Sequence, residues 1–281
     1  MASTVVDGIA TRYEVLGEGP PLLLYAPGGF DATIEKWSTQ SVYARIRLLE
    51  HLPKKYRCIV FDRRECGQSG GRVERITWQH YVRQGKGLLD HLKIERAHLL
   101  GACMGVCSVA AFAIAHPQTV LSMVLYWPVG GAKYRIKGQQ RFSDHLSFVR
   151  ENGLAKVVEH VAREGKAFNV DAKGGPWSSV IKRDPAFAQQ YSKLNVEAYK
   201  KTVQGMRDAL IDRDTAPGAE PEDLLKLQIP ALIIPGRDDS HTASAARYLE
   251  ECLPKSQFWD VLPDAQTEAS AAPRILEFLK S

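Results

Sequence analysis

The chain has 281 residues, of which 44% are hydrophobic and 25% are charged, a composition that suits one large globular core. Its net charge of +5 is spread along the sequence without a long basic run, which argues against nucleic acid as a partner. Five cysteines at irregular spacing, with no CxxC pair, argue against a disulfide framework and a metal finger and fit a reducing cytoplasm.

The N-terminal segment, MASTVVDGIATRY, lacks the basic and apolar regions of a secretory signal. The longest apolar run, VLSMVLYWPV, is about half the length of a membrane span. We therefore expect a cytoplasmic protein with no membrane partner.

Short apolar runs alternate with longer amphipathic segments, which predicts a parallel sheet covered by helices. The first predicted element is an edge hairpin over residues 8–17. Continuous apolar runs typical of buried strands follow at 21–26, 57–62, 96–102, 120–127, 230–236 and 256–263. Helical patterns lie between or after them at 77–93, 106–117, 243–254 and 271–280.

Residues 132–222 break this alternation, because they contain long helical patterns and no convincing strand. We predict that they form a helical lid over the carboxyl edge of the sheet, where open α/β sheets bind ligands. A purely structural extension is the alternative. The predicted fold is thus α/β: a mostly parallel central sheet with helices on both faces, a core of residues 1–131 and 223–281, and a helical lid inserted before the last two strands.

The strand predicted at 96–102 runs into the sequence GACMG, which places Cys103 between Gly101 and Gly105. In a Gly-x-Ser-x-Gly turn the central side chain points away from the sheet, and the glycines avoid collisions with the neighbouring strand and helix. The following helix directs its free N–H groups toward negative charge beside the nucleophile. We predict that Cys103 is a nucleophile; the alternative is a small residue buried at a tight turn.

Three stretches resemble the α/β-hydrolase fold superfamily. GLLDHLKIERAHLLGACMG with AIAHPQTVLSMVLYWP is similar to its central region, and LIIPGRDDSH to its strand and acid loop. YRCIVFDRRECGQSGG resembles its Asp-x-Arg-Gly-x-Gly-x-Ser turn, with Glu65 in place of the first glycine. The resemblance covers most of residues 15–130 and 223–280 and leaves the lid unmatched, so it is specific for the fold and less so for the reaction.

The resemblance implies an oxyanion hole with the backbone N–H of Met104 as one donor. The second donor is expected in YAPGGFDAT, with Gly29 first and Phe30 as its competitor, unless this segment is an ordinary turn. The acid is expected after PALIIPG. Asp239 has the family spacing and ranks slightly ahead of the adjacent Asp238.

The histidine departs from the family pattern. Gln266 and Thr267 stand where a Gly-His pair is expected, and no histidine follows His241. Three accounts remain open: His241 supplies the base from the acid loop, a thiol close to ionising needs no base, or the site has lost hydrolysis. With no HxH or HxxxH pair in the sequence, neither a metal nor a cofactor is expected.

Aromatic residues around the insertion favour an apolar pocket for a small, hydrophobic or ring-bearing substrate. The candidates for its lining are Tyr126, Trp127, His145 and Trp177. Because a thiolate leaves more readily than an amine, esters, lactones and thioesters suit the site better than amides. The leading hypothesis is a cysteine-dependent hydrolase that forms an acyl-enzyme on Cys103. The alternatives are a lyase, isomerase or cyclase of the same fold that uses the site for proton transfer, and a non-catalytic small-molecule receptor; a homodimer stays open.

Overall fold

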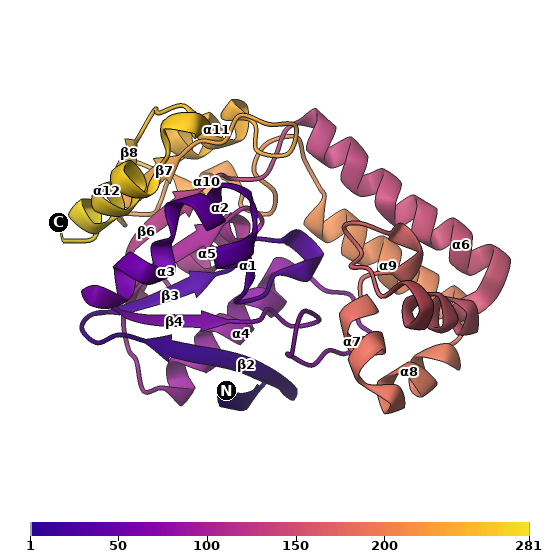
Figure 1. Cartoon of the computed structure of the whole chain (residues 1–281). Helices are drawn as coiled ribbons and strands as arrows, with labels where there is room; N and C mark the ends of the chain where they lie inside the picture. Colours follow the sequence, from indigo (N-terminus) through magenta and orange to yellow (C-terminus); the bar gives the residue numbers. More distant parts are fainter. Residues whose placement is uncertain (1, 281) are drawn as a thin grey trace.

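A computed structural model describes residues 2–280, in which helices surround an eight-stranded sheet of order β1-β2-β4-β3-β5-β6-β7-β8 (Figure 1). The strands from β4 to β8 run parallel, and β1 and β2 add an antiparallel edge. The strands are β1 (Ala2–Val6), β2 (Ile9–Leu16), β3 (Pro21–Tyr25), β4 (Arg57–Phe61), β5 (Ala97–Ala102), β6 (Val120–Tyr126), β7 (Ala231–Ile234) and β8 (Ser256–Phe258). This confirms the predicted fold class; residues 1 and 281 of the predicted core lie outside the described residues.

The edge hairpin differs from the prediction over residues 8–17. Its two strands are β1 and β2, which pair from Val6 opposite Ile9 through a two-residue turn. Asp7 and Gly8 both have positive φ in that turn, 52° and 71°, as an Asp-Gly hairpin turn requires. The predicted segment is therefore only the second half of the hairpin.

The helices that surround the sheet are short before β4 and, except for α10, longer after it. They are α1 (Lys36–Thr39), α2 (Ser41–Ile46), α3 (Leu48–His51), α4 (Trp78–His91), α5 (Gly105–Ala115), α10 (Pro221–Leu224), α11 (Ala243–Cys252) and α12 (Glu268–Lys280). Single 3-10 turns are η1 (Gly29–Asp31), η2 (Leu52–Lys54), η3 (Pro117–Thr119), η4 (Ala172–Gly174) and η5 (Pro263–Ala265). Helix α5 packs on β3, β5, β6 and α4, so the turn before it is held at the centre of the sheet.

The segment between β6 and β7 is helical, and we call residues 132–222 the helical insertion. Its main helices are α6 (Ala132–Glu164), α7 (Ser178–Arg183), α8 (Pro185–Ser192) and α9 (Val196–Leu210), which lie together beyond one end of the sheet (Figure 1). Helix α6 begins at Ala132, and its helical geometry is interrupted at Gly153, where φ is 76°.

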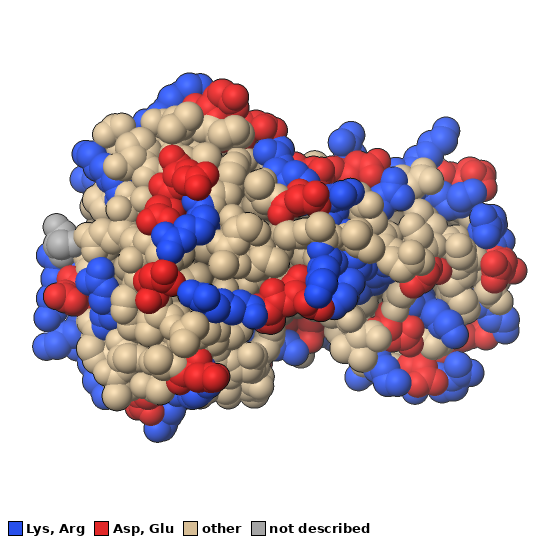
Figure 2. Space-filling model, turned by 90° about the horizontal axis from the view of Figure 1, so that it is seen from above, with Lys and Arg blue, Asp and Glu red and all other residues tan. Residues whose placement is uncertain are grey.

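On the face of the molecule in Figure 2, Lys and Arg residues alternate with Asp and Glu over both lobes, and neither sign forms a large patch. Within residues 2–280, no helix combines the length and the apolar character that crossing a membrane demands.

Candidate active site

Cys103 occupies the sharp turn between β5 and α5. Its φ is 56°, in the left-handed region, and its N–H donates a 3.0 Å hydrogen bond to the carbonyl of Tyr126 on β6. A Cβ atom at Gly101 would lie 2.5 Å from the carbonyl oxygen of Gly105, and one at Gly105 would lie 2.5 Å from that of Tyr25. The close packing of strand, turn and helix therefore requires both glycines, as the sequence pattern indicates.

The side chain of Cys103 lines a cavity of about 210 Å³, although only 9% of the residue is exposed. The cavity is bounded by the loop after β3, by one face of α6 and by the loop after β7. Residues that line it include Gly29, Tyr134, Lys137, Arg141, Asn169 and His241.

His241 and Asp238 form a hydrogen-bonded pair in the loop after β7. The imidazole Nδ1 lies 2.9 and 2.8 Å from the two carboxylate oxygens of Asp238. The backbone N–H groups of Ser240 and His241 donate to Oδ1 of the same carboxylate at 2.8 and 2.9 Å. These bonds fix Nδ1 as the donor toward Asp238 and leave Nε2, which is buried without a well-aligned hydrogen bond of its own, for Cys103.

The charges of Cys103 and His241 stabilise one another. Burial by itself raises the pKa of the Cys103 thiol, but the charge and hydrogen bonding of His241, with the backbone N–H groups of Gly28 and Met104, lower it below its ordinary value. Burial likewise opposes protonation of His241, yet the Cys103 thiolate and the Asp238 carboxylate raise the pKa of the imidazole to about 10. The two shifts have opposite directions, and both favour the charged forms, a thiolate and an imidazolium.

The other cysteines have the opposite tendency. Burial raises the pKa of Cys58 and Cys66 to about 12 and also raises the pKa of Cys107 and Cys252. Since all five cysteines lie within residues 2–280, Cys103 is the one whose thiol pKa the protein lowers.

Asp239, the acid ranked first on spacing, does not contact His241. Its carboxylate is half exposed and forms ion pairs of 2.9 Å with Lys133 and Lys137, both on α6. The structure therefore corrects the ranking, because the loop turns Asp238 toward the imidazole and Asp239 toward the insertion. Adjacent residues in a turn point in different directions, and spacing alone gave no means to choose between them.

Substitution of Asp238 and substitution of Asp239 should have different effects on activity. Asp238→Asn should lower kcat/KM for ester hydrolysis roughly a hundredfold or more, because the neutral amide no longer stabilises the imidazolium or fixes its tautomer. Asp239→Asn is the matched control and should change kcat/KM by less than about threefold, because an exposed ion pair contributes little. Steady-state kinetics of both variants measures this difference. Equal decreases in kcat/KM would show that Asp238 has no special role in catalysis.

The loop after β3 supplies backbone N–H groups on the other side of the sulfur. The backbone N–H groups of Gly28 and Met104 both help to lower the pKa of the Cys103 thiol. The N–H of Gly29 donates no hydrogen bond to any residue within 2–280, and Gly29 lines the cavity. The N–H of Phe30, the competing candidate, is already donated to Oδ1 of Asn169 at 3.3 Å. Gly29 is thus the residue of the candidate pair whose N–H is available to a ligand.

Asn169, which the sequence pattern did not single out, holds this loop from the helical insertion. Its side-chain nitrogen donates to the carbonyl of Gly28 while its oxygen accepts from Phe30. The guanidinium of Arg63 donates to the carbonyl of Gly29. Side chains distant in sequence therefore fix the peptide groups on both sides of the candidate oxyanion donor.

Asn169→Ala should lower kcat for ester hydrolysis by roughly tenfold with a smaller change in KM, because the loop loses both bonds and its N–H groups are less well aligned with a developing oxyanion. Asn152→Ala, an exposed amide on α6, is the control and should leave kcat within about twofold. A kcat for Asn169→Ala equal to that of the control would show that the loop keeps its shape without this side chain.

Gln266 occupies the first position of the Gly-His pair that the family resemblance implies, directly before Thr267 at the histidine position, and it is fully buried. Its side-chain oxygen accepts bonds from the Tyr126 hydroxyl at 2.9 Å and the Trp127 indole N–H at 2.7 Å. Its nitrogen donates to the carbonyls of Pro235 and Val261 at 2.9 and 3.0 Å. Every polar atom of the Gln266 amide thus has a hydrogen-bond partner, and these bonds connect the end of β6 to the end of β7. The imidazole of the site is instead that of His241, in the loop after β7.

The predicted aromatic lining is not found at the cavity above Cys103. His145 is fully buried and its Nε2 lies 2.6 Å from the hydroxyl of Tyr199, and the indole N–H of Trp177 donates to the carbonyl of Arg72 at 3.0 Å. These side chains fill the core of the insertion, which must bury one face of each helix to be stable. The residues predicted to line the pocket but absent from its wall are Tyr126, Trp127, His145 and Trp177.

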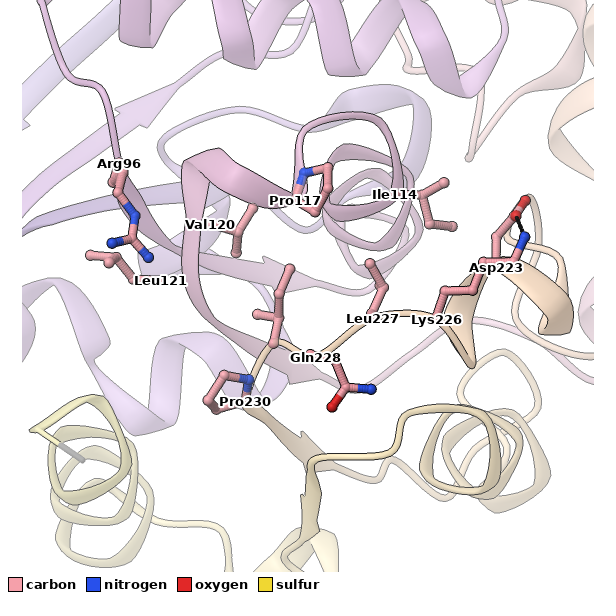
Figure 3. A pocket seen from close by; sticks show the side chains of 11 residues that line it. Arg96, Ile114, Pro117, Val120, Leu121, Asp223, Lys226, Leu227, Gln228 and Pro230 are labelled. Carbon is pink, nitrogen blue, oxygen red and sulfur yellow. Dashed lines mark hydrogen bonds and ion pairs between the residues drawn. The ribbon is translucent and has the colours of Figure 1, made fainter.

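A larger hollow of about 590 Å³ lies at the amino end of β6 (Figure 3). Cys103, in contrast, follows the carboxyl end of the parallel neighbour β5. The hollow is lined by Arg96, Val120 and Pro230 and by the ion pair between Asp223 and Lys226. It contains no cysteine, histidine or serine, so the smaller cavity above Cys103 is the candidate active site. Among residues 2–280, no three side chains of His, Cys, Asp or Glu gather as a metal site.

Residues 21–266 match the family model described as alpha/beta hydrolase fold. The chain is 32% identical over 125 residues to the dihydrolipoyllysine-residue acetyltransferase component of the acetoin cleaving system of Cupriavidus necator, a match that covers 44% of this chain and 31% of that protein. It is 23% identical over 274 residues to a proline iminopeptidase of Lactobacillus helveticus, covering 89% of this chain and 86% of the relative.

A further relative is 3-oxoadipate enol-lactonase 1 of Acinetobacter baylyi, which is 25% identical over 214 residues, or 74% of this chain and 71% of that protein. Among solved structures, the enol-lactonase of Burkholderia xenovorans LB400 has a similar fold, with a TM-score of 0.63 over 100% of both chains at 19% identity.

Proposed function

Because the chain belongs to the alpha/beta hydrolase fold family, an enzyme family, we propose that it hydrolyses a small ester, lactone or thioester through an acyl-enzyme on Cys103. The observation that carries the proposal is that Cys103 and His241 line one cavity, with His241 bonded to Asp238 and with the thiol pKa lowered and the imidazole pKa raised by their interaction. The name of the Acinetobacter baylyi relative, an enol-lactonase, supports an ester-type bond.

In the acylation step, the Cys103 thiolate attacks the carbonyl carbon and the carbonyl electron pair moves to oxygen. The N–H groups of Met104 and Gly29 stabilise that oxyanion. When the adduct collapses, the carbon–oxygen or carbon–sulfur bond to the leaving group breaks, and the His241 imidazolium gives the leaving group its proton. The product is a thioester on Cys103 and a free alcohol or thiol.

In the deacylation step, His241 is neutral and accepts a proton from water as the water oxygen attacks the thioester. Collapse of the second adduct expels the Cys103 thiolate, releases the acid and restores the imidazolium. Asp238 keeps its hydrogen bonds to Nδ1 throughout and stabilises the positive ring. With an amide, the first adduct would collapse by expelling the Cys103 thiolate, which is a better leaving group than an amine, and the substrate would be regenerated; amides are therefore disfavoured.

The helical insertion would act as the lid of this site. Residues of α6 and Asn169 form part of the cavity wall, which supports this role. A volume of about 210 Å³ is below the usual range of drug-sized pockets, roughly 300–1,000 Å³, and favours a small substrate.

The test is reaction with p-nitrophenyl acetate, followed by acid quenching and mass spectrometry of the Cys103 peptide. We expect p-nitrophenol release with turnover and an acetyl group on Cys103. Iodoacetamide labelling of Cys103 without ester turnover would favour a lyase, isomerase or cyclase instead. Neither labelling nor turnover would favour a non-catalytic receptor.

A further inference from the structure

One face of α6 forms the wall of the cavity opposite the nucleophile. Tyr134, Lys137, Gly138 and Arg141 all line the cavity with Cys103. Their spacing of i, i+3, i+4 and i+7 places them on one side of the helix. The side chains on this face of α6 would therefore contact a molecule bound in the cavity, so their chemistry would help to determine which molecules bind there.

Arg141 is a half-buried cation without a counter-ion. Its guanidinium makes no ion pair or hydrogen bond with another residue in 2–280, whereas Arg135 and Arg150 on the same helix pair with Asp214 and Glu151. Burial lowers the pKa of Arg141, and the neighbouring Tyr134 only partly offsets this. A desolvated guanidinium is costly unless a ligand supplies the missing anion.

The rest of the cavity supplies no carboxylate from residues 2–280 of the protein, and the Cys103 thiol has His241 as its partner. No Asp or Glu lines it, and the second cation, Lys137, already has Asp239 as its partner at 2.9 Å. The Tyr134 hydroxyl also lines the cavity without a hydrogen bond to a residue within 2–280, so it is free to donate. A planar guanidinium and a hydroxyl on one wall match the two oxygens of a carboxylate.

Arg141 also lines a second hollow. Together with Lys137 and Asn169 it borders both the cavity above Cys103 and a more open hollow of about 470 Å³, which we call the outer hollow. Asp144 borders that outer hollow, but its carboxylate accepts a 2.7 Å hydrogen bond from Gln140. Within residues 2–280, Arg141 is therefore the cation without a counter-ion that lines both hollows.

We infer that Arg141 and Tyr134 form a carboxylate-binding subsite, and that the substrate is a small molecule carrying a free carboxylate as well as the scissile ester-type bond. That this molecule is hydrolysed rests on the proposed function. The subsite itself rests on the unpaired guanidinium and its place in the wall of the cavity that Cys103 also lines.

Calorimetric titration with succinate tests the subsite without any reaction. We expect the wild-type protein and the control Arg150→Gln to bind succinate alike, Arg141→Gln to bind it roughly tenfold to a hundredfold more weakly, and Arg141→Lys to fall between them. Tyr134→Phe should lose a smaller factor. Circular dichroism of each variant excludes unfolding as the cause. Equal affinity of wild type and Arg141→Gln, or binding of inorganic phosphate but not of succinate, would overturn the proposal.

Kinetics then separates the subsite from the proposed function. Mono-p-nitrophenyl succinate should have a kcat/KM roughly tenfold or more above that of its methyl ester, and Arg141→Gln should abolish this ratio while Arg150→Gln keeps it. Succinate binding that depends on Arg141, without hydrolysis of either ester, would retain the subsite and refute the hydrolase. Hydrolysis of both esters without a preference for the anionic one would retain the hydrolase and refute the subsite.

Discussion

Replacement of Cys103 by alanine is expected to reduce ester turnover by at least roughly a thousandfold and to abolish the covalent acyl intermediate. The reason is that the atom that forms the bond to the carbonyl carbon is removed, while the oxyanion donors alone supply only the residual rate. Stopped-flow release of p-nitrophenol and mass spectrometry of the quenched protein measure both effects. Retention of the acyl adduct on another residue would rule out Cys103 as the nucleophile.

Cys103→Ser provides a sharper version of the same experiment. Without the thiolate charge, the pKa of His241 should fall toward its ordinary value, and a neutral imidazole must then accept the hydroxyl proton. We therefore expect a slower enzyme whose activity rises with pH through the ordinary range of histidine, whereas the activity of the wild type follows the lowered pKa of the Cys103 thiol. Identical pH profiles for the two proteins would show that the wild type does not use a thiolate–imidazolium pair.

The second large effect is expected at His241. His241→Asn should lower kcat/KM by roughly a hundredfold to a thousandfold, because the leaving group loses its proton donor and water loses its base. His91→Asn, a change at an exposed histidine, is the control and should leave kcat/KM unchanged within about twofold. Activity in His241→Asn equal to that of the control would favour a thiolate that needs no base.

The pH dependence follows from the directions of the two pKa shifts. Because His241 lowers the pKa of Cys103, alkylation of the wild type by iodoacetamide should persist as pH falls below the ordinary thiol pKa of about 8.5. In His241→Asn burial dominates, so the inflection should move to higher pH. Hydrolysis by the wild type should decline above about pH 10, where His241 loses the proton that it gives to the leaving group. An inflection unmoved by the substitution would mean that the two side chains do not interact.

The turn that carries Cys103 could be predicted from the sequence because residues close together in the chain form it. The turn at Cys103 needs only a strand, two close glycines and a helix, all of which lie within one short segment. The choice between Asp238 and Asp239 depended on Lys133 and Lys137, which reach the acid loop from α6. Nothing in the acid loop itself carries that information.

The site residues contributed by the helical insertion could not be predicted, because their position depends on contacts between segments far apart in the sequence. Asn169 and Arg141 become site residues only because α6 and the loop that follows it pack beside the end of β3. The aromatic side chains of the insertion were misassigned because composition does not distinguish the core of a helical subdomain from the wall of a pocket. His145 and Trp177 belong to that core.

The bonds of Asn169 to the loop after β3 make the alignment of the candidate oxyanion donors depend on the position of the helical insertion. The pairing of Cys103 with His241 has no such dependence on Asn169. If the helical insertion swings away, the Gly28 carbonyl and the Phe30 N–H lose their partner, while Cys103 and His241, held by the sheet and the loop after β7, remain paired. An undocked molecule would thus react with a small electrophile but turn over an ester slowly. Chemical reactivity of the sulfur and hydrolytic competence are therefore separable readouts, and only the second reports whether the insertion is seated.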